Sequence, residues 1–236
     1  MDEELNFLLQ ESEAGNAEAQ YNLACHYLNG DIVEKDVNKA FELFSKSAPK
    51  GIFEAYNNLG YLYNYGIGTE KNIEKAVECY KKAMELNCLE AQVNYAISLY
   101  KGEGIKKNVK KAIALMTEAA EKGSVLAQHT LGIIYSTDAQ IKDLQKALFF
   151  WSKAAEAGNP NSQYQLGLAY EQGEVVEKDM EKAIELWKKA ADQGQIEAIQ
   201  KLFRIAYRTD DKKEMEDCVY ILAKILHEEK KINKQE

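Results

Sequence analysis

The chain lacks the excess of basic residues that is usual in proteins that bind nucleic acids. Its 236 residues include 30 Lys and Arg but 38 Asp and Glu, so the formal net charge at pH 7 is −8. A protein that binds DNA or RNA usually carries a stripe of basic residues on one face, whereas here Lys and Glu are interleaved along the chain. We therefore expect no nucleic acid partner.

Long apolar runs and a secretory signal are also missing. No apolar run approaches the ~18 residues from which a membrane-spanning helix is recognised. The N-terminal segment MDEELNFLLQESEAG is acidic, whereas a secretory signal begins with basic residues followed by an apolar core. The sequence thus predicts a cytoplasmic protein that does not insert into membranes.

Residues that carry chemistry are few and scattered. The four cysteines show no CxxC pair and no regular spacing, which is typical of reduced, mostly buried thiols rather than of disulfides or a zinc site. Of the three histidines, His26 is adjacent to Cys25 but points to a different helix face, His129 has no carboxylate or nucleophile placed beside it by its spacing, and His227 lies in the last predicted helix. No GxGxxG or GxxxxGK(S/T) pattern follows a predicted strand. These absences predict a non-enzymatic protein with no catalytic residue, no metal and no cofactor.

What the chain does have is a repeat of about 36 residues. One set of positions is occupied by glycine, with Asn87 in the gap: Gly15, Gly51, Gly123, Gly158 and Gly194. A small residue lies four positions after each of these six: Ala19, Ala55, Ala91, Ala127, Ser162 and Ala198. A period of this length is typical of solenoids, in which stacked units build binding surfaces rather than enclosed pockets.

The first half of each repeat predicts a helix with one apolar face. In the first repeat Ala19, Leu23, Ala24 and Tyr27 follow helical spacing. Asn16, Ser124 and Asn159 are suitable N-caps for such helices, and Pro160 suits a first helical position. The position after the Leu is small in five repeats: Ala24, Gly60, Ala96, Gly132 and Gly167. Because glycine inside a helix costs ~1 kcal/mol relative to alanine, we expect two helix backbones to cross closely there. The tyrosines that share the position of Tyr27 are expected to be structural: Tyr63, Tyr135 and Tyr170.

The second half predicts another helix, so that each repeat is an antiparallel helical hairpin. Its N-caps are the Asp or Asn residues that precede each apolar run: Asp36, Asn72, Asn108, Asp143 and Asp179. A Lys-Ala pair follows each cap, and four residues beyond the alanine comes a bulky residue that we expect to fill the space between helices: Phe44, Tyr80, Met116, Trp151 and Trp187. No alternation typical of β-strands occurs, which predicts an all-α fold.

The two ends depart from the pattern, as the ends of a solenoid should. We expect one solenoid domain over residues 1–236. Its parts are an N-terminal capping helix over 2–14, five repeats, a degenerate C-terminal capping repeat over 194–229 and a frayed tail over 230–236. The five repeats span residues 15–50, 51–86, 87–122, 123–157 and 158–193. The fourth repeat has lost one loop residue, so its turn should differ locally.

The repeat reads A-x-x-G-x-x-x-A-Q-x-x-L-G-x-x-Y, then G-x-G, then D-x-x-K-A-x-x-x-W-x-K-A-A, as in the fragments GSVLAQHTLGIIY and KDMEKAIELWKKAADQG. This pattern resembles the Sel1-like repeat family, a relative of the tetratricopeptide repeats, over nearly the whole chain. The resemblance implies a right-handed α/α superhelix that serves as an adaptor or scaffold. A cysteine-rich secreted branch, to which penicillin-related activity has been attributed, is a poor match, because its paired cysteine positions hold Met84 and Ala91 here.

The resemblance to tetratricopeptide stacks also implies that the first helix of each repeat lines a concave groove. The residues expected to bind a partner protein there are Tyr21, Asn57, Tyr61, Asn64, Tyr65, Tyr100, Lys101, His129, Tyr164, Glu171, Arg204, Tyr207 and Arg208. Tyrosine is enriched at interfaces, although these tyrosines could equally cover neighbouring helices. Acidic residues toward the N-terminus (Glu18, Glu54, Glu90) and Arg204 and Arg208 toward the C-terminus would orient an extended or helical segment.

Three functions therefore remain open. The first is a scaffold that binds another protein or peptide, with a monomer favoured. The second is a dedicated inhibitor or immunity protein that neutralises one toxin or effector. The third is a hydrolase related to β-lactamases, for which the sequence offers no catalytic constellation.

Overall fold

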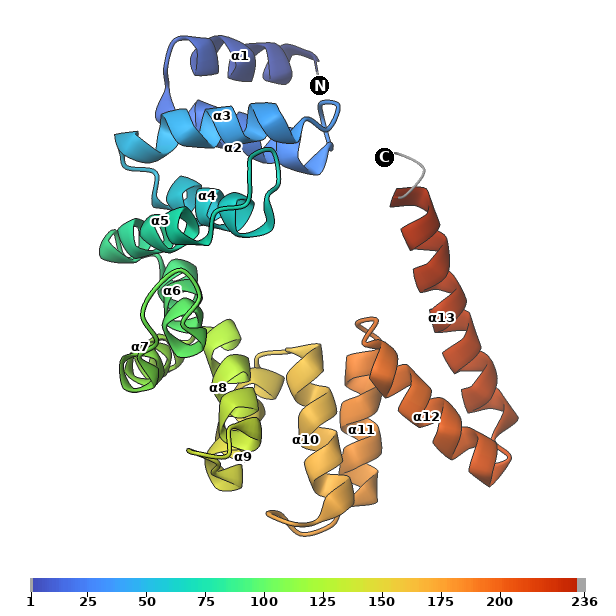
Figure 1. Ribbon diagram of the computed structural model, residues 1–236. Coiled ribbons are helices and arrows are strands. Elements are labelled where there is room, and N and C mark those ends of the chain that lie inside the picture. The colour runs from blue at the N-terminus through green and yellow to red at the C-terminus, as the bar shows by residue number, and fades with distance from the viewer. Residues whose placement is uncertain (1, 233–236) are drawn as a thin grey trace. The chain divides into compact units, whose positions relative to one another are not determined.

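The computed structural model describes the backbone of residues 2–232 and the side chains of residues 5–225, in two compact units, residues 1–124 and 125–236. Each unit consists of helices joined by short connections (Figure 1), and no strand occurs among the described residues. The side chains of His227 and of the whole expected tail, residues 230–236, lie outside the described part.

The first unit is a row of helices in which each packs against the helix before it and the helix after it. Its elements are α1 (Asp2–Glu13), α2 (Ala17–Asn29), α3 (Val37–Ser47), a short 3-10 helix (Ala48–Lys50), α4 (Phe53–Tyr65), α5 (Ile73–Glu85), α6 (Leu89–Lys101) and α7 (Val109–Glu121). The pairs α2–α3, α4–α5 and α6–α7 are the expected hairpins. Helix α1 packs on α2, as expected for half a hairpin that covers the first repeat.

The second unit repeats this arrangement. Its helices are α8 (Val125–Thr137), α9 (Leu144–Glu156), α10 (Pro160–Gln172), α11 (Met180–Ala191), α12 (Ile196–Thr209) and α13 (Lys212–Ile232). The hairpins are α8–α9, α10–α11 and α12–α13, and α9 packs on α10 as α11 packs on α12. The last helix is longer than the others, with 21 residues.

The second helix of every repeat begins at the N-cap that the sequence predicts. Asp36 accepts hydrogen bonds from the backbone N–H groups of Asn38 and Lys39, at 3.1 and 3.0 Å. The other four caps each accept one bond of 2.9–3.0 Å from the lysine three residues on: Asn72, Asn108, Asp143 and Asp179. Asn16 and Asn159 cap first helices in the same way, and Pro160 is the first residue of α10. These predictions are confirmed, and they explain where the helices start, because the caps satisfy N–H groups that have no partner within the helix.

The aspartate caps should make stability depend on pH. The pKa of the Asp36, Asp143 and Asp179 carboxyl groups is lowered, first of all by the backbone N–H of the lysine three residues on. A pKa lowered in the folded state contributes stability that is present above the unfolded value of about 3.9 and is lost as the pH falls through the folded value. We expect the triple Asp→Asn variant to be less stable than the parent at pH 7. Thermal unfolding should show this difference shrinking progressively as the pH falls below about 4.

Asn72 and Asn108 show that asparagine fits this position, so the substitution keeps the native geometry. Glu156→Gln, which changes an exposed carboxylate at the end of α9, is the control and should leave the pH profile unchanged. A stability difference between parent and triple variant that stays constant from pH 7 to pH 3 would contradict the prediction.

A lysine and a tyrosine join the two helices of each repeat. The lysine of the Lys-Ala pair lies over a tyrosine ring, with Nζ 5.0–5.7 Å from the ring centroid, in Lys39–Tyr27, Lys75–Tyr63, Lys111–Tyr95, Lys146–Tyr135 and Lys182–Tyr170. Such cation–π contacts contribute about 0.5–1 kcal/mol at exposed sites. In the third repeat the tyrosine comes from one turn earlier, since Leu99 takes the usual tyrosine position, and the contact is kept. The tyrosines at this position are therefore structural, as predicted.

The small residue after the Leu has a different neighbour from the one expected. A Cβ built on Gly60 would lie 2.5 Å from Cε1 of Tyr80, and one on Gly132 or Gly167 would overlap the indole of Trp151 or Trp187. The prediction of two closely crossing backbones is therefore wrong, because the space is taken by an aromatic side chain of the same hairpin. Where the bulky residue is Phe44 or Met116, the small residue is alanine, at Ala24 and Ala96. Glycine thus occurs opposite Tyr and Trp, and alanine opposite the smaller Phe and Met.

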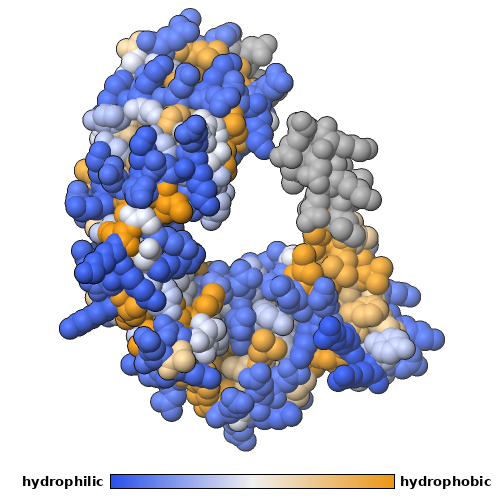
Figure 2. Space-filling view, viewed as in Figure 1, coloured by the Kyte–Doolittle hydropathy of each residue, from blue (hydrophilic) through white to orange (hydrophobic). Residues whose placement is uncertain are grey.

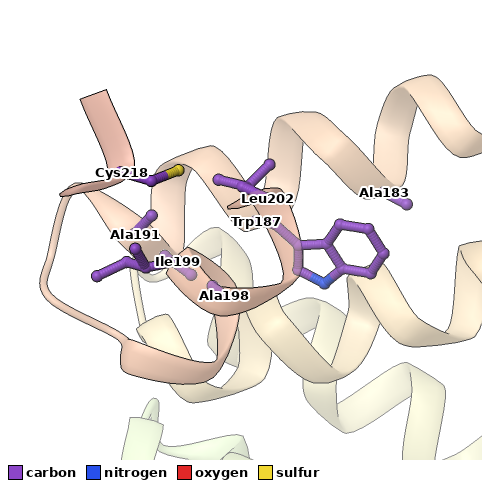
Figure 3. Close-up of a cluster of buried hydrophobic side chains, with 8 residues drawn as sticks. Ala183, Trp187, Ala191, Ala198, Ile199, Leu202 and Cys218 are labelled. Carbon is purple, nitrogen blue, oxygen red and sulfur yellow. The ribbon is translucent and has the colours of Figure 1, made fainter. Parts of the chain in front are cut away.

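The bulky residues of the second helices are buried, as predicted, and Trp187 shows how they hold a hairpin to the next one. Trp187 is completely buried in a cluster with Ala183, Ala190 and Ala191 of α11, Ala198, Ile199 and Leu202 of α12, and Cys218 of α13 (Figure 3). Its indole N–H donates a hydrogen bond of 3.2 Å to the Tyr164 carbonyl in α10. The cysteines are free, two of them buried (Cys88, Cys218) and two half-buried (Cys25, Cys79), as expected of reduced thiols.

Candidate protein-binding surfaces

In the first unit, two tyrosines expected to bind a partner lie side by side on the surface of α4. Tyr61 and Tyr65 are one helical turn apart, and their ring centroids are separated by 4.6 Å. They are 46% and 61% exposed, which is high for side chains with large apolar rings. Asn57 and Asn64 lie half-buried on the same helix. We call these four residues the α4 surface.

Helix α6, the first helix of the next repeat, carries Asn94, Tyr100 and Lys101. Asn94 donates a hydrogen bond of 3.0 Å from Nδ2 to Oδ1 of Asn57, which ties the first helices of two adjacent repeats together. Tyr100 is half-buried and lies under Lys107, whose Nζ is 5.8 Å from its ring centroid. Lys101 is exposed and lies 3.8 Å from Glu103. Of these, Lys101 is the residue most accessible to a partner.

Tyr21 of α2 belongs to the core rather than to the surface. Its ring centroid is 5.7 Å from that of Phe44, and the side chain packs against the buried cluster around Ala24 and Leu59. Burial, followed by a hydrogen bond with Cys25, raises the pKa of the Tyr21 hydroxyl to about 12. The hydroxyl is therefore neutral at physiological pH, and it interacts with Cys25 of the same helix and with Asn58 of α4.

In the second unit, His129 and Tyr164 also serve packing. Nδ1 of His129 lies 2.8 Å from Oγ of the fully buried Ser162, which joins α8 to α10. Burial lowers the pKa of His129, so its imidazole is neutral at pH 7. Tyr164 packs against the cluster around Trp187. Its backbone carbonyl accepts the hydrogen bond from the Trp187 indole N–H.

Helix α12, the first helix of the last hairpin, presents the most accessible of the residues expected to bind a partner. Tyr207 is 72% exposed, and Arg204 and Arg208 are exposed beside it; neither arginine forms an ion pair with a residue of the described part. By contrast, Glu171 of α10 is 2.7 Å from Lys201, which itself lies 5.1 Å from the Trp187 ring centroid. We call Arg204, Tyr207 and Arg208 the α12 surface. Glu171 is held by its neighbours and is not part of it.

The structure thus divides the thirteen expected residues into two groups. Seven are half-buried: Tyr21, Asn57, Asn64, Tyr100, His129, Tyr164 and Glu171. Six are exposed: Tyr61, Tyr65, Lys101, Arg204, Tyr207 and Arg208. The exposed group lies in two places, one in each unit.

Two features of the second unit have no counterpart among the expected residues. Apolar residues gather over the last hairpin (Figure 2), where Val219 and Tyr220 of α13 are 54% and 72% exposed. A pocket of about 250 Å³ also opens between α8–α9 and α10. The signal for this pocket was present in the sequence, because Val175 occupies the position of loop glycines Gly68 and Gly104.

No group of three or more His, Cys, Asp or Glu side chains within the described residues is placed to hold a metal ion. None of the helices that the structure describes has both the length and the apolar character needed to cross a membrane.

These observations define an all-α protein built from stacked helical hairpins with accessible aromatic and charged residues on first helices. The sequence model of the Sel1 repeat matches the chain five times, at residues 17–51, 53–88, 89–124, 125–159 and 160–195. The chain therefore belongs to the Sel1 repeat family, and the expected fold class is confirmed. Sel1 repeat proteins generally mediate protein–protein interactions, and the fold is typically non-enzymatic.

Solved structures support the same assignment. A Sel1 repeat protein from Oxalobacter formigenes is 28% identical, with 94% of this chain and 93% of that chain covered and a TM-score of 0.83. A protective antigen of uropathogenic Escherichia coli is 32% identical with a TM-score of 0.69, and the match covers 94% of this chain but 48% of the antigen. An immunity protein from Pseudomonas aeruginosa is 26% identical over 80% of this chain and 70% of its own, with a TM-score of 0.59. No curated protein sequence matches the chain.

Proposed function

We propose that the chain is a non-enzymatic adaptor or scaffold that binds another protein through exposed residues on the first helices of its repeats. The observation that carries this proposal is the pair Tyr61 and Tyr65. Two adjacent tyrosine rings are exposed to solvent on one helix, where each offers a large contact area and a hydroxyl. Residues of this type dominate the energetics of protein interfaces.

The charges near each surface indicate the kind of segment that would bind there. In the first unit Glu18, Glu54 and Glu90 lie in the first turns of α2, α4 and α6. The α4 surface therefore suits a segment with apolar and basic residues. The α12 surface, with Arg204 and Arg208, suits an acidic segment, because arginine binds carboxylates through two parallel hydrogen bonds.

The test is a double substitution, Tyr61→Ala with Tyr65→Ala. A partner captured from the source cell and identified by mass spectrometry would be purified, and its affinity measured by calorimetry against parent and variant. We expect the variant to bind at least 30-fold more weakly, since each residue at the centre of an interface contributes about 2 kcal/mol or more. Phe7→Ala, which removes an exposed aromatic ring from α1, is the matched control and should not change the affinity. Equal affinity of parent and double variant would place the partner elsewhere.

A second function, that of an immunity protein or inhibitor, is favoured by the comparison with Pseudomonas aeruginosa. Two of the similar structures are immunity proteins from that organism, 26% and 25% identical to this chain. The two functions differ in affinity. A scaffold that exchanges partners should bind with a Kd near the micromolar range, whereas an inhibitor should bind in the nanomolar range or tighter. The calorimetric Kd for the captured partner decides between them.

A further inference from the structure

Loop glycines close the junctions between repeats in the first unit. A Cβ built on Gly68 would overlap the carbonyl of Val37, the first residue of α3, and one on Gly104 would lie 2.7 Å from the carbonyl oxygen of Ile73, the first residue of α5. Both glycines have φ near +65°, in the left-handed region. Each loop therefore packs its backbone directly on the second helix of the repeat before it.

This close contact between the loop backbone and the preceding helix is missing between the fourth and fifth repeats. The loop segment Gly66-Ile67-Gly68 corresponds to Gly173-Glu174-Val175, and Leu144, the first residue of α9, corresponds to Val37 and Ile73. Valine carries a Cβ and two methyl groups, and Val175 does not take a positive φ. The loop cannot make the same close contact, and a pocket of about 250 Å³ lined by Leu144 and Val175 occupies this junction.

Six of the eleven side chains that line the pocket are apolar, and the polar ones include Gln165 and Gln172. Leu148 and the largely buried Trp151 of α9, with Leu168 of α10, complete the apolar lining between these two packed helices (Figure 1). At the rim, the Ser136 and Thr137 hydroxyls already donate to the Ile133 carbonyl, each at 2.8 Å. The pocket therefore offers an apolar space whose nearest hydroxyl donors are already engaged.

One charged group stands at the rim. Glu174 lines the pocket, is exposed, and forms no ion pair with a residue in the described part of the chain. The neighbouring acid, Glu171, is already paired with Lys201. A negative group beside an apolar pocket attracts a ligand that combines an apolar group with a positive charge.

We propose that this pocket takes one large apolar side chain, of leucine or phenylalanine size, from a segment of a partner protein that carries Lys or Arg next to it. The inference deepens the proposed function, since it names an anchor residue of the partner. Anchors of this kind fill pockets near the centre of protein interfaces. Complete burial of a leucine or phenylalanine side chain contributes about 10- to 100-fold in affinity.

The experiment uses the whole protein and the indole N–H signals of its two tryptophans, observed by NMR. Trp151 lines the pocket and Trp187 lies in the core beyond α10, so the first signal reports on the pocket and the second is an internal reference. The probes are capped tripeptides: Arg-Leu-Arg and Arg-Phe-Arg, with Arg-Ala-Arg and Glu-Leu-Glu for comparison. We expect the first two to shift the Trp151 signal at millimolar concentration and the last two to require at least tenfold more peptide.

Two variants test the position of the bound side chain. Ala169→Leu fills the pocket from α10 and should abolish the Trp151 shift, whereas Ala114→Leu, an exposed alanine of α7, should leave it unchanged. Glu174→Gln should remove the preference for the basic peptides. A Trp151 signal that is unmoved by all peptides, or moved equally by Glu-Leu-Glu, would overturn the inference. Because no natural partner is needed, this result is independent of the α4 surface, whose failure would instead appear as unchanged partner affinity on Tyr61→Ala with Tyr65→Ala.

Discussion

Gly167→Ala is expected to lower the free energy of unfolding by about 1–3 kcal/mol, although alanine is the better helix former by about 1 kcal/mol. A Cβ at this position would overlap the indole of Trp187, which is completely buried and hydrogen-bonded to the Tyr164 carbonyl. Neither the ring nor the helix can move without disturbing α12 and α13, which pack on the same cluster. Trp187→Ala should cost more, about 3–5 kcal/mol, because it leaves a large cavity.

The pairing rule adds a stronger test of the same contact. Ala24 faces Phe44 and Ala96 faces Met116 in other repeats, so the double variant Gly167→Ala with Trp187→Phe reproduces a natural pair. We expect this double variant to be more stable than the sum of the two single changes predicts, by about 0.5–3 kcal/mol. Chemical denaturation of the four proteins in this cycle gives the coupling directly. Additive effects would show that the glycine and the tryptophan do not share one space.

This contact also shows what could be read from the sequence and what could not. The need for a small residue after the Leu was evident from its recurrence, but its neighbour was assigned to a helix backbone. Spacing along one helix gives the size of the space and not the group that occupies it. Gly60 occurs with Tyr80 and Ala24 with Phe44, and the two residues of each pair are some 20 positions apart in the sequence. This covariation between repeats identifies the bulky side chain as the neighbour of the small residue. The caps of the second helices were predicted correctly because a cap depends on residues within one turn.

For some of the binding residues, exposure follows the position within the first helix. Tyr21 and Tyr164 share one position in their repeats with Asn57 and His129, and all four are half-buried against a neighbouring helix. Tyr65, Lys101 and Arg208 share another, in or near the last turn, and all are exposed. The sequence supplied both sets of residues but could not rank them, since their burial depends on how closely adjacent repeats pack. Position alone does not separate the two groups, because Tyr207 is exposed at the position where Asn64, Tyr100 and Glu171 are half-buried.

The pocket beside Val175 was missed for a related reason. A missing loop glycine is visible in the sequence, but its consequence depends on which backbone the glycine would have touched. Gly68 and Gly104 reveal that consequence only when their distances to the preceding repeat are known. The two junctions that keep the glycine thus serve as the reference for the junction at Val175.

Gly68→Ala is expected to destabilise the first unit by about 2–5 kcal/mol. The φ of Gly68 is +65°, in the left-handed region, which costs an alanine about 1–2 kcal/mol. The remaining loss arises because the new Cβ would overlap the Val37 carbonyl, a backbone group at the start of α3 that cannot rotate away as a side chain would. The free energy of unfolding from urea denaturation measures the sum of the two effects.

Gly51→Ala separates the backbone strain from the overlap with the preceding repeat. Gly51 has φ +100°, at least as unfavourable for alanine, yet nothing lies within 4 Å of the position that its Cβ would take. This variant should therefore lose about 1–2 kcal/mol, from backbone strain alone. A larger loss for Gly68→Ala than for Gly51→Ala means that the loop presses on the preceding repeat. Equal losses would mean that the loop moves aside freely, and the account of how Val175 opens the pocket in the second unit would fail with it.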